Sequence, residues 1–510
     1  MSERIIVRKL ILDYVAIDIA IEPFSEQGGN YYSIITGRNG SGKSRVLEAI
    51  SLCILFVELL SVEQRENIIG KNIHFPLGFI SPRIPFEYIL LEYHVGSTLN
   101  KIEIKDNTIT SFSIIYNENA NPKLICLSNS FFNRFLEGYG SSLTFPSHNQ
   151  DKYKNLSINK YLEKSKYFSD SDFVSAVLSR EIIKSFFMGK DVYARTMAFL
   201  QNFGVVGDIF LSLKVEWRIC GANLWGVTDI EKLRQSVKRI LGCGPQIETD
   251  EHLVSSLSEK LGNLLEYLNA GNEPPCSELE DDHFFVQGPS IADFIFNDDT
   301  TIQTELCKDV LYLAEHGILL LKDFRFNRNG LEMDLRKMSS GEINVFLMLI
   351  KINSEIENNS IIMIDEPEIS LHPAWQNKIL PSIESCFSQY NGCHFIIATH
   401  SPQVVASIPR KNSCVIMLDN TPNTTPGKLV HGKSSDFQLF HTLNYTGDSN
   451  EYLIKSLLTI IAKIDASTKL TNEDLIFIEK AKKMSDDIDD NDTAKYLLLQ
   501  ALALLNVVRG

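Results

Sequence analysis

The sequence predicts an α/β fold with a mixed sheet, and three short apolar runs lead to this prediction. They are Tyr31–Thr36, Ser360–Ile364 and His394–Ala398, which are rich in β-branched residues and suit buried strands. Each run is followed by reactive side chains: glycines with a lysine, two acids, or a histidine. Because ligands bind at the carboxyl ends of strands in open α/β sheets, these ends mark the expected site.

Composition limits the class of protein. The 510 residues suffice for two or three subdomains, and 44% hydrophobic with 22% charged residues is ordinary for a soluble globular chain. A net charge of −15 argues against a wholly basic, nucleic-acid-coating surface, although a local basic groove stays open. The nine cysteines show no C-x-x-C pair and fit reduced thiols, so a cytoplasmic location is expected.

No segment reads as a signal peptide or a membrane span. The N-terminus runs directly into a strand-like pattern. The most apolar stretch, Ile50–Leu60, is too short for a bilayer and contains Glu58. We therefore expect no membrane association.

Residues 1–130 are expected to form a first lobe of strands around one helix. Alternating or continuous apolar patterns predict strands at 5–12, 15–21, 31–36, 86–95, 101–104, 108–116 and 123–127, with a helix at 43–60. Residues 131–316 are expected to be an inserted, mainly helical lid without the heptads of a coiled-coil arm.

Regular structure returns in a predicted second lobe, residues 317–420. Its expected strands are 318–326, 331–335, 360–364, 394–398 and 413–418, and its expected helices are 340–355 and 373–386. Residues 421–510 are expected to form a helical C-terminal extension, interrupted by a solvated acidic loop at 485–492.

The first reactive cluster, Gly37–Ser44, reads GRNGSGKS and matches the complete phosphate-loop pattern. The glycines of such a loop let backbone N–H groups point at phosphate oxygens at a helix N-terminus. A chance match in a Gly/Ser loop is the alternative, but the strand before the loop and the helix after it favour a true site. The predicted nucleotide ligands are Asn39, Gly40, Ser41, Gly42, Lys43, Ser44 and Arg45, with Lys43 on the β- and γ-phosphates and Ser44 on Mg²⁺.

The second cluster, Asp365-Glu366, follows a buried strand in the manner of a Walker B motif. Asp365 is predicted to hold Mg²⁺, and Glu366 to act as general base toward the attacking water. Two acids that cap the next helix are the alternative reading, which the upstream phosphate loop disfavours.

Two further motifs complete the predicted site. Ser339 and the N–H of Gly341 open a helix and resemble a second anion site, although a capped helix start explains the same residues in isolation. His400 ends an apolar strand, where it can touch the γ-phosphate and sense hydrolysis. A purely structural histidine is the alternative there.

The ordered set GRNGSGKS, MSSGE, IIMIDEPEISLHP and ATHSP resembles the ABC-type ATPase heads of SMC-like proteins and OLD-family nucleases. The resemblance covers residues 1–130 and 317–420, and the run from Glu366 to Pro373 is especially similar to the OLD-like branch. It implies ATP hydrolysis in a head-to-tail dimer with two sandwiched nucleotides. Lys43, Ser44, Asp365, Glu366 and His400 of one copy would then face Ser339 and Gly341 of the other.

This sequence departs from that pattern in two places. The loop that usually offers a Gln to Mg²⁺ reads Ser128-Asn129-Ser130, so Ser128 or Asn129 is the expected substitute. The acids at 485–492 lie between helices and do not resemble the metal-binding acids of a TOPRIM nuclease domain. No nuclease site of its own is therefore expected in this chain.

An OLD-like ATPase with a lid and a short helical tail is similar to the PtuA family, the ATPase subunits of Septu and some retron antiphage systems. That resemblance implies a separately encoded HNH nuclease partner, PtuB, and in retrons a reverse transcriptase with its DNA–RNA hybrid. Tyr445–Ile454 and Tyr496–Val508 are candidate docking segments, or they simply pack on their own lobe. The leading function is thus an ATPase that controls a nuclease, with nucleic-acid sensing as a further role.

Several alternatives remain open at this point. The chain could be a nucleotide-gated scaffold with little turnover, or a DNA-repair ATPase of SMC type. A transporter ATPase is disfavoured by the long insert. Basic residues recur through a helical stretch of the lid and could contact DNA phosphates, although a solvated helix face is the stronger explanation; they are Arg180, Lys184, Lys190 and Arg195.

Overall fold

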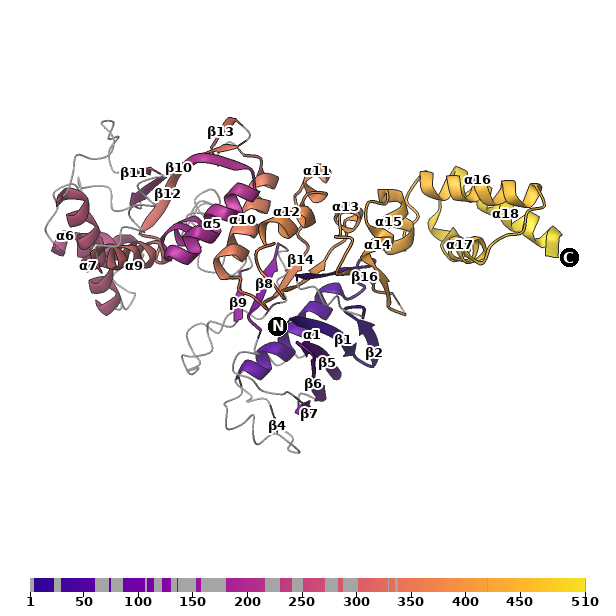
Figure 1. The fold of residues 1–510 in the computed structure, drawn as a ribbon, viewed down its shortest axis with the longest axis horizontal. Helices are drawn as coiled ribbons and strands as arrows, with labels where there is room; N and C mark the ends of the chain where they lie inside the picture. Colours follow the sequence, from indigo (N-terminus) through magenta and orange to yellow (C-terminus); the bar gives the residue numbers. More distant parts are fainter. Residues whose placement is uncertain are drawn as a thin grey trace. The chain divides into compact units, whose positions relative to one another are not determined.

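The computed structural model describes most of the chain and divides it into two compact units. The described residues are 4–22, 29–59, 73–74, 86–105, 108–113, 122–129, 135, 153–156, 180–215, 230–240, 251–270, 283–287, 301–328, 330–334, 338–419 and 421–509. The first unit comprises residues 1–157, 357–384 and 388–510, and the second comprises 158–356 and 385–387. Figure 1 colours the chain from indigo at the N-terminus to yellow at the C-terminus.

A seven-stranded, mostly parallel sheet carries the first unit. Its strand order is β17-β16-β3-β15-β14-β8-β9, and only the edge strand β17 is antiparallel to its neighbour. The central strands are buried at every residue, as expected for strands covered on both faces. The strand bounds are β3 Tyr31–Thr36, β8 Leu124–Ser128, β9 Tyr153–Asn155, β14 Ile361–Asp365, β15 His394–Ala398, β16 Ser413–Met417 and β17 Asn423–Pro426.

A second, antiparallel sheet shares a core with the first. Its order is β2-β1-β5-β6-β7-β4, with bounds β1 Ile5–Leu12, β2 Val15–Asp18, β4 Ile73–His74, β5 Tyr88–Val95, β6 Thr98–Lys105 and β7 Thr108–Ser113. Helix α1, Lys43–Leu59, contacts strands of both sheets (Figure 1), and its Leu47 and Ile50 have no exposed surface. Both sheets therefore fix the helix that begins at the phosphate loop.

Most strands of this unit lie where the sequence pattern placed them, but one predicted helix is wrong. Residues 373–386 form two helices, α11 Pro373–Gln376 and α12 Ile379–Cys386. Pro381 has no N–H to donate to a carbonyl four residues back, so it is tolerated only in the first turn of a helix. A new helix must therefore begin just before Pro381.

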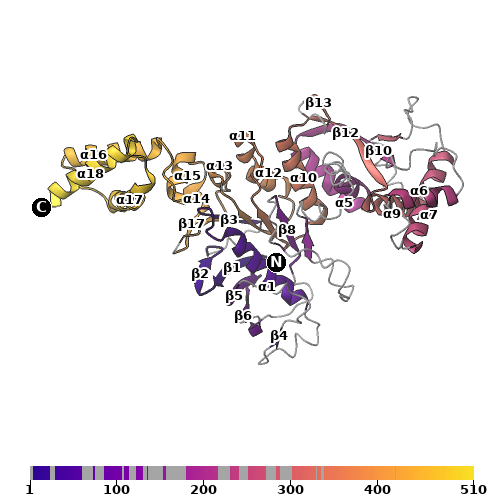
Figure 2. The same ribbon diagram turned by 180° about the vertical axis from the view of Figure 1, so that it is seen from behind.

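The C-terminal part of the first unit is a set of short helices, drawn orange to yellow in Figure 2. They are α13 Pro402–Ala406, α14 Gly427–Val430, α15 Ser435–Thr442, α16 Glu451–Asp465, α17 Asn472–Lys483 and α18 Thr493–Arg509. Helices α16 and α18 pack together, and Leu453, Leu457 and Leu498 form the centre of their own hydrophobic core. The helical extension expected from residue 421 is thus shorter, because residues 423–426 form strand β17 of the sheet, and we call residues 435–509 the C-terminal extension.

The second unit contains a sheet as well as helices, so the expectation of a mainly helical lid was incomplete. Its antiparallel sheet has the order β11-β10-β12-β13, with bounds β10 Val205–Val215, β11 His283–Gln287, β12 Leu319–Arg328 and β13 Leu331–Asp334. Its described helices include α5 Lys190–Asn202, α6 Ile230–Ile240, α7 Glu251–Ala270, α9 Thr301–Glu315 and α10 Ser340–Glu355. The unit also ends at residue 356 rather than 316, because β12 pairs with β10.

Strand β10 had a readable signal in the sequence. Ile209, Leu211 and Leu213 alternate along it and are all buried, which is the period of a strand with one covered face.

Within the described residues, no helix has both the length and the apolar character needed to cross a bilayer.

His394 joins the two sheets of the first unit. Its ring is fully buried, Nδ1 accepts the N–H of Val7 at 3.0 Å, and Nε2 lies 2.8 Å from the hydroxyl of Ser33. Ser33 donates onward to the carbonyl of Ile19 at 2.6 Å, so Nε2 carries the hydrogen and the ring is neutral. Burial lowers the pKa of His394 to about 3, and the charge of Arg4 lowers it further.

Because of His394, we expect the free energy of unfolding to fall at acidic pH. A pKa lowered below the unfolded value means that stability is fully present above pH 6.5 and is lost as the pH falls toward 3. In His394→Gln we expect the free energy of unfolding to drop about 1 kcal/mol less between pH 7.5 and 5.5 than in the wild type. Urea unfolding at the two pH values measures this, with the exposed His252→Gln as control. An unchanged pH slope would remove His394 from this role.

Candidate functional site

The predicted motifs meet at one edge of the parallel sheet. Asp365 at the end of β14 pairs in register with Ala398 of β15, and Ala398 pairs with Ile35 of β3. On the other side, Asp365 lies opposite Ser128, the last residue of β8. The strand order thus places the phosphate loop, the two acids and the histidine side by side, at the edge where α/β folds bind ligands.

The phosphate loop has the backbone that its glycines allow. Gly37, Gly40 and Gly42 all have positive φ, at 150°, 79° and 94°. A Cβ on Gly37 would lie 2.6 Å from the carbonyl of Leu418, whereas one on Gly40 or Gly42 would meet nothing within 4 Å. Open space at the last two glycines, directly before α1, suits a cradle for phosphate oxygens.

Lys43 is buried at the centre of this loop, with 4% of its surface exposed. Its ammonium donates to the carbonyls of Gly37 at 3.0 Å and Arg38 at 3.2 Å, and lies 3.2 Å from Nδ1 of His400. Burial lowers the pKa of Lys43 to about 8, against the opposing effect of Glu366, Asp365 and Glu368. A bound anion would favour the charged form of this lysine.

One carboxylate oxygen of Asp365 is available to bind a ligand. The residue is 2% exposed, and its Oδ1 is buried with no hydrogen-bond partner among the described residues. Burial raises the pKa of Asp365 to about 6, and the nearby Glu366 and Glu368 raise it further, while a hydrogen bond from Ser44 lowers it. Ser44 and Asp365 thus bring two hard oxygen donors together, the kind that Mg²⁺ prefers.

The same observation tests whether a metal fits. Among the described residues, no cluster of three or more His, Cys, Asp or Glu side chains could hold a metal ion alone. Mg²⁺ usually keeps several waters and takes one or two protein oxygens together with substrate phosphates. Ser44 and Asp365 next to a phosphate cradle fit that mode of binding.

Glu366 stands in a strained backbone conformation beside them. Its φ is 52°, and its N–H donates to the carbonyl of Ala398 at 2.9 Å. Left-handed φ in a residue other than glycine costs of order 1–3 kcal/mol and clusters at functional sites. The turn places the Glu366 carboxylate 3.6 Å from Nε2 of His400.

His400 links the lysine to the glutamate. Burial lowers the pKa of His400 to about 4, with Lys43 contributing, so the ring is neutral near pH 7. Since the Lys43 ammonium can only donate, Nδ1 of His400 accepts and Nε2 carries the hydrogen that faces Glu366. This tautomer turns the N–H dipole of His400 toward the carboxylate of Glu366, at a distance longer than a hydrogen bond.

Glu368 is a site residue that motif reasoning missed. Its Oε1 accepts the backbone N–H of His400 at 2.5 Å, and its Oε2 is buried without a partner among the described residues. Burial raises the pKa of Glu368, against hydrogen bonds from His400 and Thr399 that lower it. Glu368 therefore ties the turn after β14 to the end of β15. As the third acid of Asp365-Glu366-Pro367-Glu368, it had no other signal in the sequence.

Removing this tie should slow turnover without weakening nucleotide binding. In Glu368→Ala, we expect kcat for ATP to fall at least tenfold, because the His400 backbone loses its anchor, with KM within about twofold. Glu368→Gln keeps an oxygen that can accept the same N–H and should stay within about threefold of wild-type kcat. Steady-state kinetics of both variants measure this; equal losses in the two would refute the positioning role.

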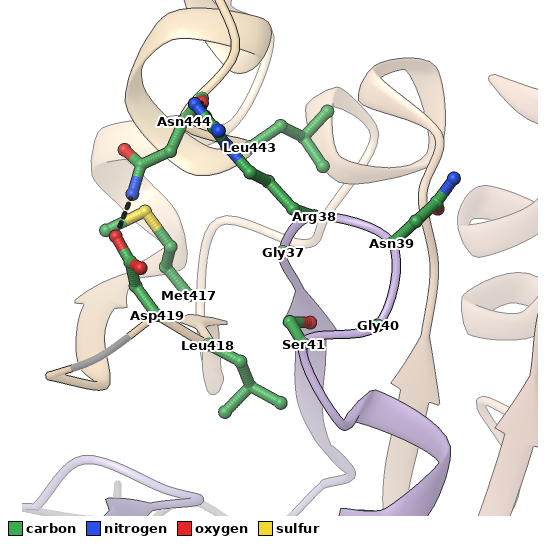
Figure 3. A pocket seen from close by; sticks show the side chains of 10 residues that line it. All are labelled: Gly37, Arg38, Asn39, Gly40, Ser41, Met417, Leu418, Asp419, Leu443 and Asn444. Carbon is green, nitrogen blue, oxygen red and sulfur yellow. Dashed lines mark hydrogen bonds between the residues drawn. The ribbon is translucent and has the colours of Figure 1, made fainter. Parts of the chain in front are cut away.

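Three other predicted ligands line a pocket on one side of the loop. Asn39, Gly40 and Ser41 border a cavity of about 360 Å³, together with Gly37, Arg38, Met417, Leu418, Asp419, Leu443 and Asn444 (Figure 3). This volume lies within the range of small-molecule sites. The seventh predicted ligand, Arg45, pairs with Asp13 at 3.0 Å and stacks over Phe86.

Ser128 and Asn129, the expected substitutes for the family's Gln, both lie beside the acids. Ser128 is 1% exposed and opposite Asp365, and the N–H of Asn129 donates to the carbonyl of Asp365 at 3.2 Å. The amide Nδ2 of Asn129 lies 3.5 Å from the carbonyl of Pro367. Either side chain is thus next to the proposed metal ligands.

Ser339 and Gly341 belong to the second unit, at the N-terminus of α10. Ser339 caps this helix: its hydroxyl accepts the N–H of Glu342, whose carboxylate accepts the N–H of Ser339 in return. The capped helix start, the alternative explanation of this motif, is therefore present in the structure. Ser339 is nevertheless exposed, so its surface stays open to another molecule.

The lid residues whose side chains are described, Arg180, Lys184 and Arg195, do not form an open basic face. Lys184 is 17% exposed and forms an ion pair with Glu355, which is 6% exposed. Arg180 and Arg195 are half-buried. Lys184 therefore fits neither the solvated helix face that was the stronger explanation nor the alternative of phosphate contact, because its charge is neutralised inside the second unit. The side chain of Lys190 lies outside the described residues.

Comparisons with known proteins find similarity to probable ATPases. Residues 269–406 match the family model described as "AAA domain, putative AbiEii toxin, Type IV TA system". The chain is 24% identical over 472 residues to the Retron Vc95 probable ATPase of Vibrio cholerae serotype O1 biovar El Tor, covering 88% of this chain and 81% of that protein. It is 28% identical over 184 residues to the Retron Ec83 probable ATPase of Escherichia coli, 33% of each chain.

Two solved structures align over most of the chain at low similarity. The Smc head domain with an extended coiled coil bound to the C-terminal domain of ScpA, from Pyrococcus furiosus, gives a TM-score of 0.29 at 12% identity, covering 83% of this chain and 97% of that one. Stu0660 of Streptococcus thermophilus gives 0.29 at 10% identity, covering 97% and 99%. Scores this low do not establish a common fold, so the α/β, phosphate-loop fold rests on the strand order and site geometry above.

Proposed function

We propose that this chain is the ATP-binding and ATP-hydrolysing subunit of a bacterial, cytoplasmic antiphage defence complex. One observation carries the proposal: Lys43, Asp365, Glu366 and His400 meet at a single sheet edge although they come from distant parts of the sequence. Similarity to two probable ATPases of retrons supports both the reaction and its context.

Each of the site residues has a separate role in the proposed hydrolysis. The loop N–H groups and Lys43 bind the β- and γ-phosphates, and Ser44 with Asp365 would hold Mg²⁺. Mg²⁺, when bound, supplies positive charge at the phosphate oxygens. Glu366 accepts the proton of the attacking water, and the Nε2–H of His400 faces its carboxylate. Glu368 fixes the backbone from which His400 projects.

A second copy of the chain completes the site in this proposal. The resemblance to ABC-type heads implies a head-to-tail dimer in which Ser339 and Gly341 face the nucleotide of the partner. The exposure of Ser339 at the N-terminus of a 16-residue helix supports it, because such an end favours anions.

The proposed effector is a separately encoded nuclease of HNH type, as in PtuA–PtuB pairs of Septu and retron systems. A retron setting would add a reverse transcriptase with its DNA–RNA hybrid, and DNA is a further candidate ligand. The C-terminal extension supports a docking role because it exposes large apolar side chains, which often mark interaction sites. They are Tyr445, Leu458, Ile476, Tyr496 and Leu499.

Phage protection in cells tests the proposal against a nucleotide-gated scaffold. The gene is expressed with its genomic neighbours, as wild type, Lys43→Ala or Glu366→Gln. Loss of protection in both variants supports an ATPase whose turnover drives defence. Protection that survives in Glu366→Gln but not in Lys43→Ala would instead favour gating by ATP binding alone. Protection in both variants would contradict any role for this site.

A further inference from the structure

Arg38 of the phosphate loop is bound to the C-terminal extension. Its Nε and Nη2 donate to the carbonyl of Asn444 at 3.0 and 2.8 Å, and Nη2 also pairs with the carboxylate of Asp487. The amide of Asn444 donates to Asp419 at 2.7 Å, beside the end of β16 (Figure 3). We call the contact of Arg38 with Asn444 and Asp487 the arginine clasp.

The clasp connects Arg38 to two segments, around Asn444 and around Asp487, that are bonded to each other. The hydroxyl of Thr446 lies 3.4 Å from the carbonyl of Asp487, and Asp492 accepts the N–H of Ser449 at 2.7 Å. Both segments border the core formed by helices α16 and α18. The acidic stretch 485–492, expected to be a solvated loop, thus holds structural contacts in Asp487 and Asp492.

The backbone of Arg38 is at the same time part of the phosphate site. Its carbonyl accepts the Lys43 ammonium at 3.2 Å and the N–H of Ser41 at 3.1 Å. The three N–H groups of the Lys43 ammonium face the carbonyls of Gly37 and Arg38 and Nδ1 of His400, so a phosphate that Lys43 binds must displace at least one of the three. Where a carbonyl is displaced, the peptide unit next to Arg38 loses this anchor and can turn, and the direction of the Arg38 side chain can change with it.

We propose that phosphate binding at the loop and the arginine clasp oppose each other, so that the nucleotide loosens the C-terminal extension through Arg38. The proposal rests on the proposed function in one respect, because it takes ATP as the ligand of the loop. It goes further by naming the part of the chain that responds. Coupling of this kind is reciprocal, so breaking the clasp must tighten ATP binding by the same factor.

Asp487→Ala tests the coupling from the extension side, and Asp486→Ala, an exposed neighbour, removes the same charge as a control. The clasp is partly exposed, so we expect the Kd for ATP with Mg²⁺ to fall about two- to fivefold in Asp487→Ala and to stay unchanged in Asp486→Ala. Hydrogen exchange at 444–449 should rise when ATP is added to the wild type. In Asp487→Ala, it should be raised before ATP is added.

The outcomes separate this inference from the proposed function. If the wild type binds ATP and Asp487→Ala binds it equally well or more weakly, the opposition is refuted while the ATPase proposal stands. If the wild type does not bind ATP, the proposed function itself fails. In Arg38→Ala, the further change Asp487→Ala should have no effect on Kd; an additional gain there would show that Asp487 acts by another route.

Discussion

Glu366→Gln should reduce kcat for ATP hydrolysis at least a hundredfold and leave the Kd for ATP within about threefold of the wild type. The glutamine keeps the size of the side chain but cannot take a proton from the attacking water. Binding should persist because the loop glycines, Lys43 and Ser44 are unchanged. Phosphate release and equilibrium binding measured on the same preparation check the two halves of this expectation.

The position of Glu366 makes this effect specific. Its backbone is held at φ 52° by the N–H bond to Ala398, so the side chain of residue 366 projects from the same point in the variant. Glu473→Gln, at an exposed site in the first turn of α17, provides the matched control and should hydrolyse ATP normally. Hydrolysis by Glu366→Gln at the wild-type rate would assign the general base to another residue.

Lys43→Ala should weaken ATP binding at least a hundredfold and abolish measurable hydrolysis. Lys43 is the buried cation at the centre of the loop, and charge-assisted hydrogen bonds to phosphate are among the strongest in proteins. The substitution should not unfold the chain, because removing a buried ammonium also removes its desolvation cost. Titration with a fluorescent ATP analogue measures the affinity, and thermal unfolding confirms the fold.

An exposed lysine provides the comparison. Lys455 has 76% of its side chain exposed and pairs with Glu451 on the surface of α16, so Lys455→Ala loses the same charge far from the sheet edge. Its affinity for ATP should equal that of the wild type. ATP binding by Lys43→Ala with near-normal affinity would place the nucleotide site elsewhere.

The sheet edge could be predicted from sequence because its strands are buried on both faces. Strands β3, β14 and β15 read as unbroken apolar runs, and the reactive residues stand directly after them. Local pattern and tertiary packing agree at these positions. The bounds of β3 and β15 therefore match the expected residues, and those of β14 differ by one.

Other features depend on contacts that no local pattern encodes. Glu368 matters because it accepts the N–H of His400, which is 32 residues away in sequence. Asp487 resembles several other acids of its loop, and its contacts with Arg38 and Thr446 distinguish it from Asp486. His394 resembled any buried strand residue, although its ring joins β15 to β1. In each case the role follows from a partner brought close by the fold.

The second unit shows a different limit. Strand β10 carries a clear alternation of buried residues, but its long-range partners β11 and β12 lie far along the chain. The reading of a mainly helical lid followed from the helices on either side of that strand. A sheet formed by strands so distant in sequence is not visible until they pair.

We propose above all that one sheet edge, assembled from three distant motifs, hydrolyses ATP. Phosphate release by the purified chain in ATP and Mg²⁺, compared with Lys43→Ala and Glu366→Gln prepared in the same way, tests it most directly. We predict release by the wild type and a loss of at least a hundredfold in both variants. Release by the wild type that is no faster than that of Lys43→Ala would contradict the account.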